Sequence, residues 1–230
     1  MTRPHRVLVA DDDPLVREAY RAFFSHQPDF TLCGEARDGA EAVSAYATLQ
    51  PTLVLMDLQM PGTSGIDATA LITERWASAC VVALTTFGTR DYIVAALRAG
   101  AAGYLLKDVG GPALLAGMRQ AITGDMPLSS AVRRELVSTM VAEQRLVPEP
   151  PELGLTPRER ELLLWLAQGL TNHQIGSQMY VSEGSVKQYL THIGDKLGVS
   201  SRTQILVKSI QLGYVDPHVL PPITDEILAR

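Results

Sequence analysis

The sequence is poor in the residue types on which several classes of protein depend. Its 230 residues include two cysteines and two tryptophans, and aromatic residues make up 6% of the chain. Cys33 and Cys80 stand in apolar contexts without metal-ligand spacing, which favours reduced, packed thiols over a disulfide. No apolar run approaches the roughly 20 residues that a bilayer span requires. The first run ends in acids after a few positions, too early for a secretory signal, so we expect a cytoplasmic protein without a membrane segment.

A strong positive charge is also missing. The formal net charge is −5, and residues 1–124 carry 13 Asp and Glu against 10 Lys and Arg. Residues 153–216 are nearly neutral, with six basic and five acidic residues. The sequence therefore argues against a protein coated with positive potential, and the acidity is concentrated in the N-terminal part.

What the N-terminal part contains is a regular alternation of two patterns. From residue 6 to about residue 123, short apolar runs rich in β-branched residues alternate five times with helical patterns. Five strand–helix units predict a parallel, doubly wound, flavodoxin-like sheet with helices on both faces. In such α/β sheets the binding crevice lies beyond the carboxyl ends of the strands.

Beyond Gly124 the pattern changes. A helical stretch at residues 129–144 precedes the proline-rich sequence VPEPPEL, which favours an extended spacer. Four helical segments without a convincing strand follow. We therefore predict an α/β domain at 1–124, a linker with a short helix at 125–152, an all-α domain at 153–216 and a tail at 217–230.

Capping signals predict a helix-turn-helix inside the all-α domain. The sequences TPRE, starting at Thr156, and TNHQ, starting at Thr171, are both capping boxes, and Ser182 can cap a third helix. Two capped helices about ten residues apart, joined by a tight turn, are typical of a helix-turn-helix.

The sequence VLVADDDP places three acids at the end of the first predicted strand. Asp11 and Asp12 end that strand, and Asp57 ends the third. With these strands adjacent in the sheet, the three carboxylates converge at the switch point, where they need a counter-charge. Oxygen ligands of this kind favour a hard divalent cation, and we expect Mg²⁺. For Asp13, next to Pro14, capping of the following helix is the better interpretation.

Two further residues end strands in the same crevice. Thr85 closes the fourth strand with a hydroxyl, and Lys107 closes the fifth with a cation. A carboxylate nucleophile, a metal, a hydroxyl and a lysine together indicate phosphoryl transfer. Taken singly, each is weak, because lysines after strands are usually solvated and threonines are common in strands.

Several separated motifs, in this order, carry a resemblance to a known family. The N-terminal motifs are VLVADDDP, LVLMDLQMPGTSGID, VVALTTF and GYLLKD, and they resemble the receiver domain of bacterial two-component response regulators. The C-terminal stretch LTPRERELLLWLAQGLTNHQIGSQMYVSEGSVKQYLTHIGDKLGVSSRTQ is similar to the LuxR-type DNA-binding domain. Their order and spacing match the NarL/FixJ subfamily across nearly the whole chain.

The resemblance implies a role for each acid of the cluster. Asp57 would be the phospho-acceptor, taking a phosphoryl group from a sensor histidine kinase. Asp12 would bind Mg²⁺ directly, Asp11 chiefly through water, and the backbone carbonyl of Gln59 would be another ligand. The protein would be a switch that catalyses only its own modification, not an enzyme with an external substrate.

The resemblance also implies how the modification is read. Thr85 and Lys107 would contact the phosphoryl oxygens, and the orientation of Tyr104 would follow Thr85. Gln59 and Thr86 flank this chemistry and are expected to influence the lifetime of the acyl phosphate. The expected readout surface is formed by the fourth helix, the fifth strand and the fifth helix.

The predicted recognition helix follows Ser182 and has two faces. Val186, Leu190, Ile193 and Leu197 recur at helical spacing and are expected in the core. The opposite face can reach base edges of double-stranded DNA, and residues at helix starts can bind phosphate. The expected DNA contacts are Thr171, Asn172, Ser182, Glu183, Ser185, Lys187, Gln188 and Thr191. The alternative is an amphipathic helix with an ordinary solvated face.

Few basic residues accompany that helix. Only Lys187, Lys196 and Arg202 lie in or just after it, so one copy should bind DNA weakly at physiological salt. We therefore expect a homodimer on phosphorylation, since two linked contacts raise binding by about 10² to 10⁴. The last helix is expected to expose Ile205, Leu206 and Ile210 for this contact.

Two alternatives remain. A phosphatase of the haloacid dehalogenase type also uses a strand-terminal Asp with Mg²⁺, but it requires Asp-x-Asp, and Gln59 stands at the second position. An atypical receiver would keep the DNA-binding role without phosphorylation, although the complete set of acceptor residues argues against it.

Overall fold

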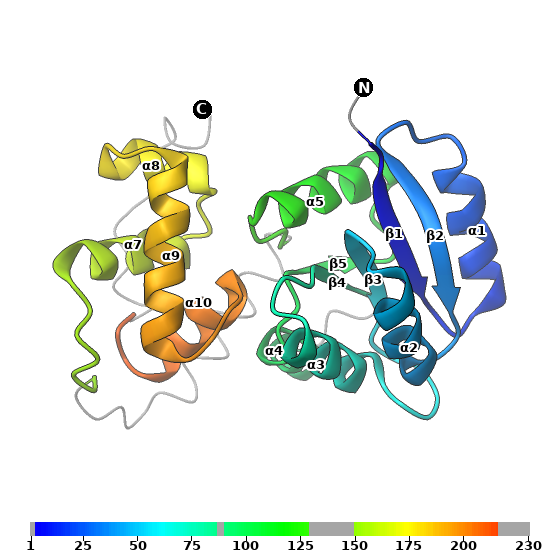
Figure 1. Ribbon diagram of the computed structural model, residues 1–230, viewed down its shortest axis with the longest axis horizontal. Coiled ribbons are helices and arrows are strands. Elements are labelled where there is room, and N and C mark those ends of the chain that lie inside the picture. Colours follow the sequence, from blue (N-terminus) through cyan, green and yellow to red (C-terminus); the bar gives the residue numbers. More distant parts are fainter. Residues whose placement is uncertain (1–2, 87–89, 129–149, 216–230) are drawn as a thin grey trace. The chain divides into compact units, whose positions relative to one another are not determined.

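The computed structural model describes residues 3–86, 90–128 and 150–215, and Figure 1 shows its ribbon. The chain divides into two compact units. One comprises Met1–Thr123 with Pro127–Ser129, and the other comprises Gly124–Met126 with Ser130–Arg230. The predicted helix at residues 129–144 and the predicted tail at 217–230 lie outside the described residues.

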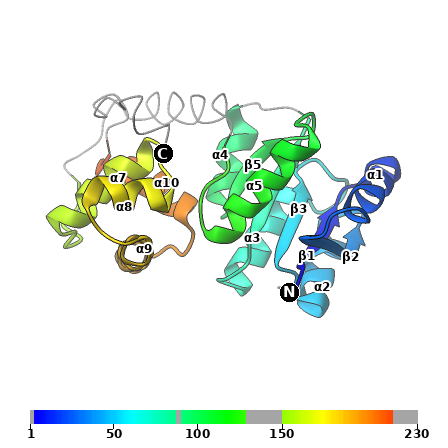
Figure 2. The same cartoon turned by 90° about the horizontal axis from the view of Figure 1, so that it is seen from above.

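The N-terminal unit is a five-stranded parallel sheet with helices on both faces, as the sequence predicted (Figures 1 and 2). The strand order is β2-β1-β3-β4-β5, so β1 lies between β2 and β3. The elements are β1 (His5–Ala10), α1 (Pro14–Phe24), β2 (Phe30–Ala36), α2 (Gly39–Leu49), β3 (Leu53–Asp57), α3 (Gly65–Arg75), β4 (Val81–Thr85), α4 (Arg90–Arg98), β5 (Gly103–Leu106) and α5 (Gly111–Thr123). The chain order reverses between β1 and β3, and such a switch point is where ligands of open α/β sheets bind.

Alternation along the strands divides the core into two layers. Val7 and Val9 of β1 pack with side chains of α1 and α5, whereas Leu8 and Ala10 pack with side chains of α2 and α3. Successive side chains of a strand point to opposite faces, so a strand covered by helices on both faces must be apolar throughout. The continuous apolar runs in the sequence follow from this requirement.

Local chemistry fixes where the helices beside the site begin. Asp13 accepts a hydrogen bond from the backbone N–H of Leu15 at 2.8 Å and caps α1, which confirms the capping interpretation. Gly65 begins α3 where a Cβ atom would stand 1.8 Å from the backbone oxygen of Asp57. Only glycine allows α3 to start against the end of β3.

The regular elements of the C-terminal unit, within its described residues, are all helices. It contains α7 (Pro157–Ala167), α8 (Asn172–Met179), α9 (Glu183–Leu197) and α10 (Arg202–Gln211). Both predicted capping boxes are formed, at the starts of α7 and α8, and Ser182 caps α9. The four apolar side chains predicted for the buried face of α9 are buried: Val186, Leu190, Ile193 and Leu197.

The expectation of an apolar surface on α10 is wrong. Ile205, Leu206 and Ile210 are 2%, 3% and 1% exposed, because α10 packs against α7 and α9 and its apolar side chains complete this unit's core. A three-helix core of this size would leave apolar surface in water, so the fourth helix covers it.

Both cysteines are half-buried. Cys33 and Cys80 are free thiols, and burial raises the pKa of Cys80 to about 12, which makes it a poor nucleophile. Among the helices in the described ranges, none is long and apolar enough to cross a bilayer.

Candidate functional site

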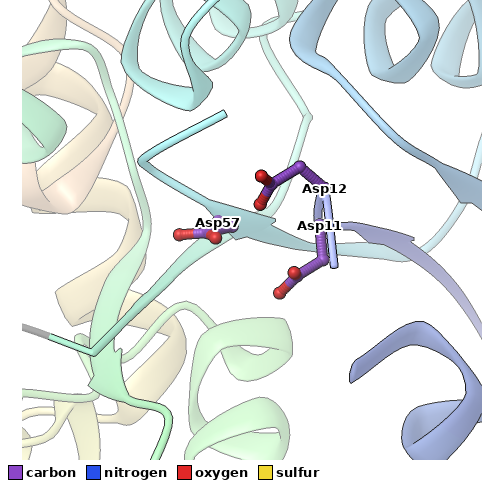
Figure 3. Close-up of side chains that lie close together, drawn as sticks. All are labelled: Asp11, Asp12 and Asp57. Atoms are coloured by element: carbon purple, nitrogen blue, oxygen red, sulfur yellow. The ribbon is translucent and has the colours of Figure 1, made fainter. Parts of the chain in front are cut away.

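Three carboxylates meet at the carboxyl ends of β1 and β3. Asp11 and Asp12 follow β1, and Asp57 is the last residue of β3, which pairs directly with β1. One carboxylate oxygen from each of the three lies within 4.8 Å of the others, and Figure 3 shows the three side chains close together at the ends of these strands. Asp11 and Asp57 are 2% and 6% exposed, whereas Asp12 is exposed. The convergence predicted from strand order is therefore present.

Lys107 adds a cation to this group. It follows β5, and its Nζ atom lies 2.6 Å from Asp11 Oδ2 and 2.7 Å from Asp57 Oδ2. Burial opposes the charged form of Lys107, but hydrogen bonds with the two carboxylates raise its pKa above the ordinary value. Burial is also the main reason why the pKa of Asp11 is raised.

The charge of this group matches a divalent cation. Three carboxylates and one ammonium carry a formal charge of −2, and all the candidate ligand atoms are oxygens. Hard cations such as Mg²⁺ prefer oxygen ligands and bind with few protein carboxylates. The residues present therefore fit Mg²⁺ in both charge and donor type.

A buried hydroxyl pair lies on the neighbouring strands. Thr85 ends β4, Tyr104 lies in β5, and both side chains are almost completely buried. Burial raises the pKa of Tyr104 to about 12, while a hydrogen bond with Thr85 opposes this and the nearby charge of Asp57 adds to it. The predicted coupling of Thr85 with Tyr104 thus has a direct contact. Thr86 is exposed.

Gln59 makes a contact that the sequence gave no sign of. Its backbone N–H donates to Asp57 Oδ1 at 3.2 Å, and its side-chain Nε2 donates to the hydroxyl of Tyr92 in α4 at 2.8 Å. Gln59 therefore connects the loop after β3 to α4, a helix of the expected readout surface. Its predicted role as a carbonyl ligand of the metal stays a prediction.

Arg17, like Tyr92, is a residue that sequence reasoning missed. It lies in the first turns of α1, and its Nη1 atom donates to the backbone oxygens of Asp11 at 2.6 Å and Asp12 at 3.0 Å. A basic residue shortly after an acidic loop, at the start of a helix, was the available signal.

In the C-terminal unit the predicted recognition face of α9 is presented to solvent. Ser182, Glu183, Lys187, Gln188 and Thr191 are exposed, and Ser185 is half-buried. Lys187 pairs with Glu183 at 3.0 Å, one helical turn away. The hydroxyls of Ser182 and Ser185 lie 2.9 Å apart. These short polar side chains lie around the start of α9, where recognition helices contact base edges.

The structure differs from the expectations at the start of α8. Asn172 is expected to offer a free N–H at a helix start to phosphate, but this N–H donates to Asp125 Oδ1 at 2.9 Å. The residue is 2% exposed, and its side-chain oxygen accepts a hydrogen bond from Arg202. Its amide instead satisfies a guanidinium whose pKa burial lowers to about 10. Thr171 forms a closed capping box with Gln174, which uses both its hydroxyl and its backbone N–H.

Basic charge near α9 is smaller than the sequence suggested. Lys196 donates to both carboxylate oxygens of Glu159, at 2.7 and 3.0 Å, and to the backbone oxygen of Gly154. Arg202 donates to the side chain of Asn172. Of the three basic residues in or just after α9, Lys187 is therefore the one that is exposed and able to contact DNA phosphate.

Comparison with known proteins gives a consistent result for both units. The family model of the response regulator receiver domain matches residues 7–119, and that of bacterial regulatory proteins of the luxR family matches residues 153–209. The uncharacterized transcriptional regulatory protein YxjL of Bacillus subtilis (strain 168) is 38% identical over 211 residues, which are 91% of this chain and 97% of that protein. The nitrate/nitrite response regulator protein NarL of Escherichia coli (strain K12) is 35% identical over 204 residues, covering 89% and 94%.

A solved structure shows the same likeness. The response regulator ChrA of a heme-sensing two-component system has a TM-score of 0.50 and 36% identity, and the match covers 92% of this chain and 99% of that one.

Proposed function

Because this chain belongs to the NarL/FixJ subfamily of two-component response regulators, which regulate transcription by binding DNA, we propose that Asp57 is its phospho-acceptor. Residues 1–124 would then receive the signal and residues 153–216 would bind the DNA. The observation that supports this assignment is the position of the Asp57 carboxylate, at the switch point of the sheet and 2.7 Å from Lys107 Nζ.

The reaction is a phosphoryl transfer from a histidine of a sensor kinase. An oxygen of the Asp57 carboxylate attacks phosphorus, an O–P bond forms, the P–N bond to the imidazole breaks, and its electron pair remains on the imidazole nitrogen. Lys107, which holds Asp57 in the unmodified protein, pairs with an equatorial phosphoryl oxygen. Thr85, at the end of β4, offers a hydroxyl to another oxygen.

Mg²⁺ is the cofactor that we propose for this site. Asp11, Asp12 and Asp57 would hold it, together with the backbone carbonyl of Gln59. When bound, the ion supplies charge neutralisation for the negative oxygens of the transferring group. The supporting observation is the formal charge of −2 that remains after Lys107 is counted.

The output follows from the charge of the acyl phosphate. The phosphoryl group adds negative charge and new hydrogen-bond acceptors beside Thr85. Thr85 contacts Tyr104, which lies in β5, the central element of the α4–β5–α5 surface. We infer that this surface is read out by formation of a homodimer. One copy offers α9 with a single exposed lysine, so that binding of two copies to adjacent half-sites is needed for useful affinity.

The side chains proposed to contact double-stranded DNA are those on the exposed face of α9. They are Ser182, Glu183, Ser185, Lys187, Gln188 and Thr191. Thr171 remains a proposed phosphate contact because it stands at the start of α8, although its own backbone N–H already donates to Gln174.

Intact-mass measurement tests the assignment of Asp57. Full-length wild type and Asp57→Asn are incubated with acetyl phosphate and Mg²⁺, and with Mg²⁺ replaced by chelator. We expect the mass of one phosphoryl group on the wild type, only when Mg²⁺ is present, and none on Asp57→Asn. Modification of Asp57→Asn to the same extent as wild type would contradict the assignment. Sustained hydrolysis of a phosphomonoester would contradict the proposal that no external substrate is turned over.

A further inference from the structure

A guanidinium is bound to the backbone that carries the two N-terminal acids of the site. Arg17 Nη1 donates to the backbone oxygens of both Asp11 and Asp12, at 2.6 and 3.0 Å. The side chain is 18% exposed. Side chains of a helix lean toward its N-terminus, so a residue in the first turns of α1 can reach back to the loop before it.

Glu35 holds the guanidinium from its other side. Arg17 Nε lies 3.8 Å from Glu35 Oε2, and Glu35 is itself bound at both oxygens by Arg21, at 2.9 and 2.8 Å. Glu35 lies in β2 opposite Val9 of β1, two positions before Asp11. The guanidinium of Arg17 is therefore fixed between α1, the edge strand and the acidic loop.

The two acids differ in how their carboxylates are held. Asp11 accepts from the backbone N–H of Asp13 at 3.1 Å on one oxygen and from Lys107 on the other. Within the described parts of the chain, no hydrogen bond to the carboxylate of Asp12 is found, so its direction depends on the backbone. Arg17 is the side chain that fixes that backbone.

We propose that Arg17 is a positioning residue for the cation, holding the loop between β1 and α1 so that Asp11 and Asp12 are directed at the metal before it binds. This inference rests on the proposed Mg²⁺ site. Partners that orient metal ligands typically contribute 10- to 100-fold to metal affinity, because without them the ligands must be ordered when the ion binds. Nη1 of Arg17 reaches both carbonyl oxygens while Nε faces Glu35. A lysine ammonium ends one bond short of the Nη1 position and has no second nitrogen for Glu35, so it cannot keep this arrangement.

Two other accounts of Arg17 predict different results. If Arg17 only joins α1 to the sheet, its loss lowers stability and leaves Mg²⁺ affinity unchanged. If its positive charge mainly repels the cation, its loss tightens Mg²⁺ binding. Arg17→Lys keeps the charge and loses the two-carbonyl contact, so it separates charge from positioning.

The test is calorimetric titration of full-length protein with Mg²⁺ alone, without a phosphoryl donor. The variants are Arg17→Met, Arg17→Lys and the matched control Arg21→Met. Arg21 also binds Glu35 but does not contact the backbone oxygens of Asp11 and Asp12, so its loss should leave the loop in place. Urea unfolding in chelator is measured in parallel to verify that each variant is folded. We expect a Kd about 10-fold higher for Arg17→Met, an intermediate increase for Arg17→Lys, and no change for Arg21→Met.

Each outcome decides the proposal. A Kd of Arg17→Met equal to that of wild type, or lower, would overturn it while wild type still binds Mg²⁺ and the proposed function stands. If Arg17→Met does not fold, Arg17→Lys alone decides, since a wild-type Kd for this variant is enough to reject positioning. Absence of saturable Mg²⁺ binding by wild type itself would remove the metal site and this inference with it.

Discussion

The Nζ atom of Lys107 lies 2.7 Å from Asp57 Oδ2, although 50 positions separate the two residues in the chain. The same Nζ lies 2.6 Å from Asp11 Oδ2. The ammonium therefore lies between two buried carboxylates and offsets part of their negative charge. Replacing Lys107 by an uncharged residue should therefore lower the free energy of unfolding, because the repulsion between these carboxylates is no longer offset.

Lys107→Met is expected to destabilise the protein in chelator and to make its stability depend more strongly on Mg²⁺ than that of wild type. Breaking a buried ion pair costs about 3 to 5 kcal/mol because a charge is left unpaired. A ligand that binds only the folded state raises stability, and above its Kd the gain grows with the logarithm of its concentration. Urea unfolding in chelator and in Mg²⁺ measures both effects, and Lys107→Arg, which keeps the charge, is the control. Equal stability of Lys107→Met and wild type in chelator would contradict this account.

Gly65→Ala is expected to disturb the end of β3. The new Cβ would stand 1.8 Å from the backbone oxygen of Asp57, so α3 or β3 must move, and we expect a loss of about 3 kcal/mol or more in the free energy of unfolding. Gly62→Ala is the matched control in the same loop. It has φ +73° but no atom within 4 Å of the added Cβ, so only backbone strain of about 1 to 2 kcal/mol is expected. Similar losses for both variants would show that the contact with Asp57 is not the cause.

Strand ends explain why so much of the site could be predicted. Asp11, Asp57, Thr85 and Lys107 stand at or directly after the carboxyl ends of apolar runs, and parallel strands bring those ends to one edge. Arg17 and Tyr92 were missed because they reach the site from helix surfaces, where the direction of a long side chain depends on tertiary packing.

The same limit explains the errors in the C-terminal unit. Helical periodicity showed that α10 has an apolar face, but not whether that face covers its own core or a second copy. Ile205 is buried in the core, and Lys196, counted as a free charge, is bonded to Glu159. The order of residues along one helix does not show which side chains of another helix they will pack against or bond to.

Acid should weaken the C-terminal unit through Glu159. Burial opposes ionisation of this carboxyl, but hydrogen bonds from Lys196 and from Thr156 lower its pKa below the usual value of 4.5. A lowered pKa means that the unfolded chain binds the proton more tightly. The contribution to stability is therefore present above pH 4.5 and is lost as the pH falls through the lower pKa of the folded state.

Thermal unfolding against pH checks this sign. Trp165 fluorescence in the full-length Trp76→Phe background reports on the C-terminal unit. We expect Glu159→Gln to be less stable than its parent above pH 4.5 and to show a flatter acid limb. The control is Glu161→Gln, which breaks only a surface pair with Arg158 and should keep the parent's pH dependence. An unchanged acid limb in Glu159→Gln would show that another group carries the transition.

Lys187 and Lys196 should differ sharply in their effect on DNA binding, although both lie in α9. Lys187 is exposed, so Lys187→Met should remove about one phosphate contact per bound copy and lower the slope of log K against log salt by about 0.9 for each copy. Lys196 is bonded to Glu159 and Gly154, so Lys196→Met should cost stability but leave the slope unchanged.

Gln188→Ala should instead change base preference by about 1 to 3 kcal/mol at one position, since a glutamine amide reads a base edge.

Salt-dependent binding of the phosphorylated full-length variants to a duplex selected from random sequences separates these effects. At a temperature where Lys196→Met is fully folded, an equal fall in slope for both lysine variants would show that Lys196 leaves Glu159 to meet phosphate. An unchanged slope for Lys187→Met would show that the exposed face of α9 does not meet the DNA backbone at that position. Lys196, the other lysine of α9, is only 31% exposed and is paired with Glu159.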